Sequence, residues 1–326
     1  MTQRRPHPAA RIAAQQQNTG YDWTDIPHSA LLAVLMKSAL LYATTVLTGG
    51  LVWFATKFQL GVVPPEISLT YRFSVAALLL TGFASVLRQP LKFGVVVHFR
   101  LALFGALVFG GNFALLYAAI ENLTSGLVAI IFSTSVLMNI AFGMVFLGRK
   151  IERGMVIGAL LGVCGLGFIF HADLLQLRSS NVRTLAIVQA LTATMLFSLG
   201  NMVSAGLQAE RIPALVSTAF AMAYGALLLL VYAVVRGKPF LFEITQGYIL
   251  SLMYLTIFGS VIGYSTYFTL LGRIGPERTA YTTVLVPALA LGVSTVFEGF
   301  TWSSAALVGA GLIFSGNVAI LRKRIG

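Results

Sequence analysis

Ten apolar stretches of about 18 to 25 residues follow one another along this chain. Each is long enough to cross the ~30 Å hydrocarbon core of a bilayer as a helix. Lipid offers no hydrogen-bonding partner, so a crossing segment must satisfy its own backbone groups, and a helix does so. Only 10% of the residues are charged, against about 25% in a soluble domain. The sequence therefore predicts an all-α polytopic membrane protein with ten transmembrane helices, at about residues 34–55, 66–87, 99–119, 123–147, 154–171, 184–206, 213–235, 247–271, 276–297 and 302–321.

The ten stretches form two similar sets of five. The first set matches the second at an offset of 148 to 152 residues, which places Gly50 opposite Gly200 and Pro65 opposite Pro213. Because five is an odd number, the second set must enter the bilayer from the opposite side. Inverted repeats of this kind usually form two lobes with a binding site between them near the midplane. We expect two inverted five-helix repeats, residues 30–175 and residues 184–326.

The basic residues predict how these helices are oriented. The net charge is +12 at pH 7. If both termini are cytoplasmic, sixteen lysines and arginines fall on the cytoplasmic side and five on the outer side, which follows the positive-inside rule. We therefore expect a multi-pass protein of the plasma (bacterial inner) membrane with both termini cytoplasmic. The basic residues form no continuous stripe, so no nucleic-acid partner is expected.

Residues 1–29 are polar and contain three prolines and a run of glutamines. This composition predicts a disordered cytoplasmic tail. A cleaved secretory signal is the alternative, but no apolar core begins before Ala30.

The residues that carry metal, redox and hydrolytic chemistry are scarce. The only cysteine is Cys164, and the four histidines lie in the tail or near helix ends. The sequence contains no HExxH zinc motif and no nucleotide-binding GxxxxGK[ST] loop. We expect no cofactor and no bound metal, and the chain is not expected to be an enzyme.

Several stretches resemble the EamA-type branch of the drug/metabolite transporter superfamily, from about residue 38 to residue 322. They are KFQLGVVPPEISLTYRF, LTSGLVAIIFS, FLGRKIERGMVIGALLG and GPERTAYTTVLVPALALGVSTVFEGF. The resemblance implies ten helices in two inverted repeats and a central cavity lined mainly by helices 1, 3, 4, 6, 8 and 9. Such proteins commonly export amino acids or related metabolites. The sequence departs from the family at Ser135, where many members carry a proline matching Pro287, so paired proline kinks are not implied.

Three polar side chains inside the spans are candidates for a binding site, because polar groups within a membrane are costly. Arg72 lies about 10 Å along its helix from Pro65. It can attract a substrate carboxylate, or it can have a structural role by snorkelling or by pairing with Glu121 or Glu298. Asn112 and Asn201 can bind an amino-acid zwitterion through their amides, or hydrogen-bond between helices.

Aromatic side chains supply a second set of candidates. They combine apolar area with a polar tip that suits an amphipathic metabolite. The alternative is an interfacial belt, in which aromatics near helix ends meet the lipid headgroups. The candidates are Trp53, Tyr117, Tyr264, Tyr267 and Tyr281.

Two further features concern motion and assembly. Pro287 removes a backbone hydrogen bond from helix 9. The resulting kink, with the hydroxyl of Thr282 on the turn before it, is a candidate for binding a polar group of the substrate, and it can also act as a hinge or be static. Glycines spaced along helices 5 and 10 indicate close packing of these two helices, within one chain or in a homodimer.

Together these patterns predict a secondary transporter that exports a small metabolite, such as an amino acid or its derivative, by alternating access around a central cavity. The expected partners are this small-molecule substrate and the lipid bilayer. A membrane sensor or partner subunit without transport is the first alternative. An intramembrane enzyme acting on a lipid-linked substrate is the second.

Overall fold

The computed structural model describes residues 28–148, 153–169, 181–280 and 302–322, together with residues 282, 286, 292–293 and 295–297. Residues 1–27 of the predicted tail, Tyr281 and Pro287 lie outside these ranges. The described residues form helices and connecting turns and contain no strand. The all-α class predicted from the sequence is therefore confirmed.

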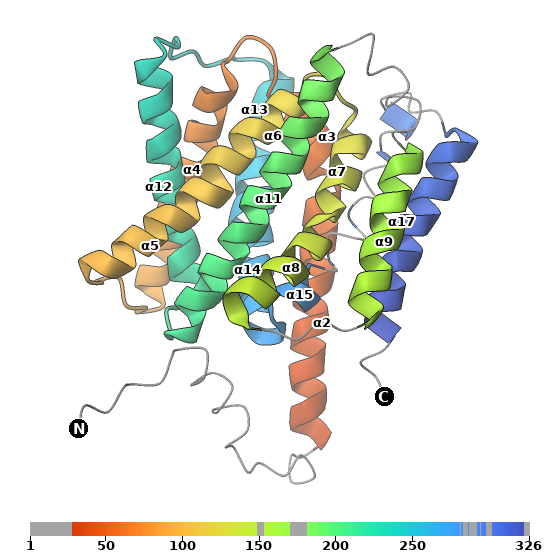
Figure 1. Cartoon of the computed structure of the whole chain (residues 1–326). Coiled ribbons are helices and arrows are strands. Elements are labelled where there is room, and N and C mark those ends of the chain that lie inside the picture. Colours follow the sequence, from red (N-terminus) through yellow and green to blue (C-terminus); the bar gives the residue numbers. More distant parts are fainter. Residues whose placement is uncertain are drawn as a thin grey trace, which may run out of the picture.

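The helices form a bundle in which most elements run along the vertical axis of the view and a few cross it obliquely (Figure 1). Two short elements, η2 and η3, are π-helical. The elements are α2 (His28–Gly50), α3 (Val52–Lys57), α4 (Pro65–Val86), α5 (Val95–Gly105), η2 (Ala106–Gly111), α6 (Asn112–Ile120), α7 (Ser125–Ser133), α8 (Ser135–Leu147), α9 (Arg153–Ile169), α11 (Asn181–Ala209), α12 (Ala214–Val235), α13 (Gln246–Tyr254), η3 (Leu255–Tyr264), α14 (Ser265–Ile274), α15 (Pro276–Thr279) and α17 (Ser304–Arg322).

Seven helical stretches among the described residues are long and apolar enough to cross a membrane. They coincide with predicted helices 1–4 and 6–8. Predicted helix 5 is represented by the 17 residues of α9, and helix 10 by the 19 residues of α17. Most of predicted helix 9 falls outside the described residues. The seven stretches are Ser38–Lys57, Pro65–Val86, Val95–Ile120, Leu127–Leu147, Asn181–Ala209, Ala214–Val235 and Gln246–Ile274.

Predicted helix 4 is interrupted, although it has no proline. α7 ends at Ser133 and α8 begins at Ser135, with Thr134 between them. The Thr134 hydroxyl donates to the Ile131 carbonyl at 2.6 Å, and its backbone N–H donates to the same oxygen at 3.0 Å. A hydroxyl that competes in this way for a backbone acceptor bends a helix.

Predicted helices 3 and 8 share an irregularity that no sequence pattern indicated. Each contains a π-helical segment in its middle, η2 in Val95–Ile120 and η3 in Gln246–Ile274. The two segments begin 149 residues apart, at Ala106 and Leu255. π-Helical turns are rare and occur frequently at functional sites.

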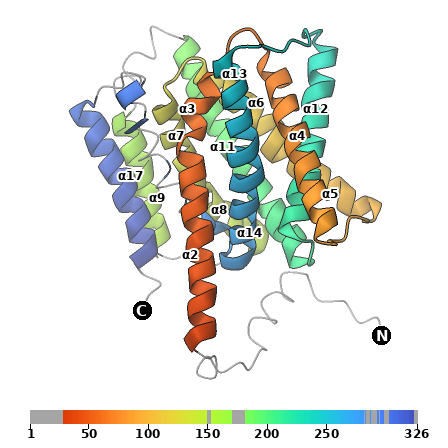
Figure 2. The same ribbon diagram turned by 180° about the vertical axis from the view of Figure 1, so that it is seen from behind.

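Other elements correspond at the same spacing. α4 and α12 are both 22 residues long, begin 149 residues apart, and each follows a proline N-cap, Pro64 or Pro213. In Figures 1 and 2, α2 and α11, which open the two sets, run in opposite directions. α4 packs along α12, and α9 packs along α17.

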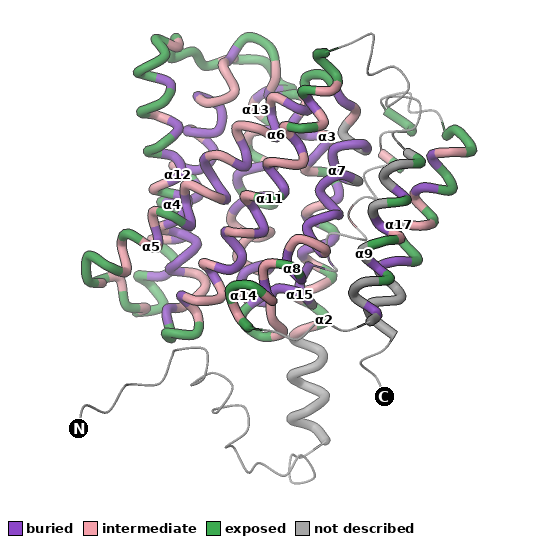
Figure 3. Tube along the Cα trace, viewed as in Figure 1, coloured by how far each residue is buried: buried purple, intermediate pink, exposed green. Residues whose placement is uncertain are grey.

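Buried residues gather where the helices face one another, and exposed residues cover the outer faces and the helix ends (Figure 3). Leu78 and Val145, inside two of the spans, are 73% and 74% exposed. Apolar side chains that point outward from a span are suited to lipid.

Two spans approach each other closely at a pair of glycines on α5 and α12. A Cβ atom on Gly105 would collide with the backbone oxygen of Ala221 and lie 3.0 Å from the Gly225 nitrogen. A Cβ atom on Gly225 would lie 2.5 Å from Cβ of Phe109. Small residues at such a crossing let the backbones of membrane helices approach.

Candidate functional site

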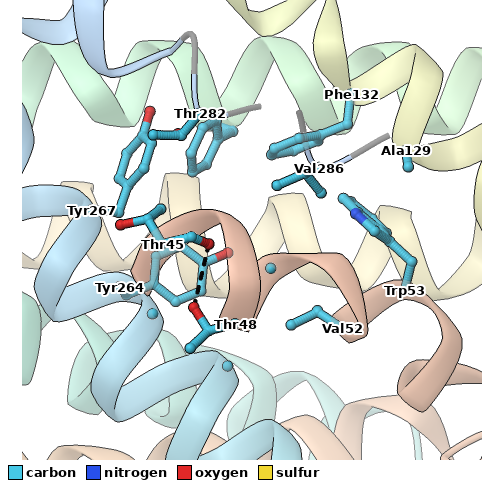
Figure 4. A pocket seen from close by; sticks show the side chains of 14 residues that line it. Thr45, Thr48, Val52, Trp53, Ala129, Phe132, Tyr264, Tyr267, Thr282 and Val286 are labelled. Carbon is cyan, nitrogen blue, oxygen red and sulfur yellow. Dashed lines mark hydrogen bonds between the residues drawn. The ribbon is translucent and has the colours of Figure 1, made fainter. Parts of the chain in front are cut away.

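A cavity lies among the helices, lined equally by the two halves of the chain (Figure 4). Its volume is about 90 Å³. Seven lining residues come from residues 45–132 and seven from residues 197–286. We call it the main cavity. Its wall consists of Thr45, Thr48, Gly49, Val52, Trp53, Ala129, Phe132, Phe197, Gly259, Gly263, Tyr264, Tyr267, Thr282 and Val286.

Three threonine hydroxyls interrupt the mostly apolar and aromatic wall. Thr45 donates to the Leu41 carbonyl at 2.8 Å, and its oxygen also lies 3.0 Å from the Thr266 hydroxyl. Thr282 donates to the Thr279 carbonyl at 2.8 Å. Thr48 donates to the backbone of its own helix in the same way. Because each hydroxyl hydrogen is engaged, the remaining oxygen lone pairs are the groups left to accept a hydrogen bond from a bound molecule. A ligand with an N–H donor and an apolar body fits this wall.

A smaller cavity of about 40 Å³ adjoins the first. The two share Val52, Trp53, Phe132 and Tyr264. The Trp53 ring packs edge-on against Phe132, with ring centroids 5.2 Å apart. The remaining walls of this second cavity are Thr56, Phe113, Leu116, Tyr117 and Ile120.

The structure brings together four of the five aromatic candidates. Trp53, Tyr264 and Tyr267 line the main cavity, and Tyr117 lines the second cavity. Trp53 is 7% exposed and Tyr117 is 1% exposed. Both side chains are therefore enclosed by protein, which is not the position of an interfacial belt.

Asn201 lines neither cavity, but it hydrogen-bonds Tyr267, which lines the main cavity. Its side-chain nitrogen donates to the Tyr267 hydroxyl at 3.0 Å and to Oδ1 of Asn139 at 3.2 Å. Asn201 and Asn139 are both fully buried. The amide thus links α11, α8 and α14 and fixes the orientation of the Tyr267 ring at the cavity wall.

We expect Asn201→Ala to destabilise the protein by about 1–3 kcal/mol, because the Tyr267 hydroxyl would be left buried without its donor. The midpoint of thermal unfolding in detergent measures this loss. Asn112→Ala is the matched control, since Asn112 is also fully buried but donates only to Val108 in its own helix. It should shift the midpoint by much less. An equal shift for both variants would contradict the linking role of Asn201.

Asn112 and Arg72 lie outside both cavity walls. Asn112 donates to the Val108 carbonyl at 3.0 Å, and its Oδ1 has no partner among the described residues. Arg72 is 1% exposed, and its Nε donates to the Ser260 hydroxyl at 2.8 Å. Its guanidinium carbon lies 4.9 Å from the ring centre of Phe113, which does line the second cavity. This burial excludes snorkelling.

Sequence reasoning missed several wall residues. Thr45 and Thr48 are three residues apart on one helical face, which is a signal that could have identified them. Phe132 and Phe197 have no distinguishing signal, because a phenylalanine in a span is most often a packing residue. Within the described ranges, no three histidine, cysteine, aspartate or glutamate side chains group as metal ligands would.

Comparison with known proteins supplies the family. The EamA-like transporter family matches residues 36–171 and residues 184–322. The chain is 26% identical to a Salmonella typhimurium protein named "Probable amino-acid metabolite efflux pump", over 86% of this chain and 93% of that protein. An Escherichia coli protein of the same name is 25% identical, over 88% of this chain and 97% of that protein.

A solved structure titled "Crystal structure of protein" shares the fold. It superposes with a TM-score of 0.67 at 18% identity, covering 88% of this chain and 98% of that chain. The resemblance read from the sequence motifs is confirmed, since the family match extends over both halves. The chain is therefore a multi-pass membrane protein that belongs to the EamA-like transporter family, within the drug/metabolite transporter superfamily.

Proposed function

We propose that the chain is a secondary transporter that moves a small amino-acid-like metabolite out of the cell through the main cavity. The observation that carries this proposal is the shared wall, to which each half contributes seven residues. If one half rocks against the other, such a cavity can face the two sides of the membrane in turn.

Two inverted five-helix repeats, ten spans in all, are part of this proposal. The support is the 149-residue spacing of α4 and α12 and of η2 and η3, together with the opposite directions of α2 and α11. The packing of α9 on α17 accounts within one chain for the glycines of these helices: a Cβ atom on Gly316 would lie 2.8 Å from the Gly158 oxygen. A homodimer through the same helices stays a prediction.

The proposed orientation in the plasma membrane, with both termini cytoplasmic, can be tested at two equivalent positions. Gln89 and Lys238 lie 149 residues apart. In each, the backbone N–H donates a hydrogen bond of 2.9 Å to the carbonyl oxygen of the residue five positions earlier in the chain. In a Cys164→Ser background, Gln89→Cys should resist an impermeant thiol reagent in intact cells, and Lys238→Cys should react. Both cysteines should react after permeabilisation. Labelling of both in intact cells would contradict the inverted arrangement.

An amino-acid-like substrate is favoured by the chemistry of the wall. Aromatic rings offer apolar contact, and the threonine oxygens accept hydrogen bonds from an ammonium group. Two relatives, each about a quarter identical, are named as amino-acid metabolite efflux pumps. The names of these two proteins refer to amino-acid metabolites and to efflux, and we extend that substrate class and that direction to this chain.

Counterflow in liposomes tests the transport itself. The purified protein should exchange at least one compound from a panel of amino acids, amines and sugars, whereas protein-free liposomes should not. Tyr264→Phe should lower this flux about tenfold, because it removes a hydroxyl from the cavity wall that can bond a polar substrate. Tyr232→Phe is the control, since Tyr232 is 46% exposed on α12. Normal flux in the Tyr264 variant would show that the substrate binds elsewhere.

A further inference from the structure

Two glutamines at equivalent positions of the two halves make the same kind of hydrogen bond. Gln59 and Gln208 lie 149 residues apart, which is also the spacing between α4 and α12. Nε2 of Gln59 donates to the Tyr248 carbonyl at 2.9 Å, and Nε2 of Gln208 donates to the Phe268 carbonyl at 3.1 Å. Each Nε2 also donates to a serine hydroxyl. Each amide thus joins the end of one span to a backbone carbonyl of another.

The two carbonyls are not equivalent, although the two amides are. Gln59 lies just after the first span, Gln208 lies near the end of the sixth, and both carbonyls belong to the eighth span. Gln59 therefore bonds across the two halves, whereas Gln208 bonds within the second half. In an exact two-fold arrangement the partner of Gln208 would be Phe99 in the third span, because Phe99 lies 149 residues before Tyr248.

The space beside the two amides is unequal in the same sense. The second cavity lies between the first and third spans, since α3 and α6 supply most of its wall. At the corresponding place in the second half, hydrogen bonds from Asn201 to Tyr267 and from Gln208 to Phe268 join the sixth and eighth spans. If the two halves exchange their conformations, the first place closes and the second opens. In the proposed orientation, the described conformation is the one that opens outward.

The alternative partner of Gln208 lies on a helix that α11 already contacts at this end of the bundle. Glu210, two residues after Gln208, makes an ion pair of 2.6 Å with Arg100, the residue after Phe99. A Cβ atom on Gly206 would lie 3.0 Å from Nη2 of Arg100. Because α11 packs against both α14 and α5, Gln208 has a helix with backbone acceptors on either side.

We propose that Gln59 and Gln208 are paired latches that exchange partners when the cavity changes sides. In the described conformation, Gln59 and Gln208 hold the first and sixth spans to the eighth. In the opposite conformation, Gln208 bonds the Phe99 carbonyl of the third span, and Gln59 bonds the third span across the closed second cavity. The inference rests on the proposed function, because it names the residues that set the balance between the two conformations of alternating access.

The exchange predicts opposite effects for the loss of the two amides. Gln59 is 1% exposed and Gln208 is half-buried, and a hydrogen bond is stronger where water is excluded. Gln59→Leu therefore removes the stronger bond from the described conformation and the weaker bond from the opposite one. Gln208→Leu does the reverse, because its bond to Phe99 would be equivalent to the present bond of Gln59. The first variant favours the opposite conformation, and the second favours the described one.

The test follows a cysteine in the wall of the main cavity, Ala129→Cys, in a Cys164→Ser background. Its reaction rate with an impermeant thiol reagent is measured from outside in intact cells and from inside in inverted membrane vesicles. Gln59→Leu should lower the ratio of the outside rate to the inside rate at least about threefold, and Gln208→Leu should raise it by a similar factor. Gln246→Leu is the control, because Gln246 is exposed at the start of α13, and it should leave the ratio unchanged.

Gly272→Ala tests the exchange without removing an amide, and it decides the question if Gln59→Leu does not fold. A Cβ atom on Gly272 would collide with Oε1 of Gln208. It would displace the amide from α14 and leave the bond to the third span possible, so the ratio should fall. Gln208→Leu should raise the ratio, whereas a purely structural role of Gln208 predicts the same direction for both variants. Gly82→Ala is the control, because a Cβ atom there meets no atom within 4 Å.

The outcomes separate this inference from the proposed transport. Opposite shifts of the ratio without counterflow of any compound would support the latches and refute the transport. Counterflow together with shifts in the same direction, with reversed shifts, or with an unchanged ratio in either folded glutamine variant would refute the latches and support the transport.

Discussion

Gly105→Ala is expected to abolish the yield of folded protein or to destabilise it by more than about 3 kcal/mol, at the upper end of what overpacking costs. The added methyl group would meet the backbone oxygen of Ala221 on α12. A backbone atom inside a helix cannot rotate away as a side chain can, so α5 and α12 would have to separate. The measurements are the amount of monodisperse protein in size-exclusion chromatography and the midpoint of thermal unfolding.

Gly82→Ala is the control for this prediction as well. Gly82 lies in α4, where a new Cβ atom has open space around it. Alanine favours a helix over glycine by up to about 1 kcal/mol, so this variant should be as stable as the wild type or slightly more so. Gly105→Ala protein obtained in normal yield with an unchanged midpoint would show that the two backbones do not cross as closely as described.

Trp53→Ala is expected to have the largest effect on the cavity. Trp53 belongs to the walls of both cavities and packs against Phe132. Removing the indole would join the two cavities and leave the Phe132 ring without its aromatic neighbour. The cavity created in this way should lower the free energy of unfolding by about 3–5 kcal/mol. Flux in liposomes should fall at least about tenfold, because the enlarged space no longer contacts a small substrate on that side.

Trp302→Ala is the matched control. Trp302 is 40% exposed and donates from its indole to Thr295, away from both cavity walls. Its loss should leave flux unchanged and shift the unfolding midpoint only slightly. Unaltered flux in Trp53→Ala, at normal protein levels, would contradict the assignment of the substrate to these cavities.

The architecture could be predicted from the sequence as far as hydrophobicity and family motifs determine it. Length and apolarity placed helices such as α4 and α12 within one or two residues of their observed bounds. The π-helical segments could not be predicted, because they depend on packing between helices and not on local composition. The same holds for the break at Thr134, where the signal expected for a break, a proline, is absent.

The candidate site was predicted only in part. Aromatic residues with a polar group were identified as candidates, because such groups are unusual in an apolar span. Of these candidates, Trp53, Tyr264 and Tyr267 line the main cavity. Gly259 carried no such signal: its place in the wall of that cavity depends on how η3 packs against α2. Sequence patterns show which residues share a face of one helix, but not which faces of two distant helices meet.

The π-helical segments of the third and eighth spans have a consequence for how these spans can change shape. A π turn holds one residue more than an α turn, so it acts as an insertion that the helix absorbs without losing its backbone bonds. If the wide turn moves along the helix by one turn, the residues it passes rotate by about 100° about the axis. η3 contains Gly259 and Tyr264 of the main wall. The eighth span can thus turn part of the cavity surface away from a ligand while remaining a continuous rod.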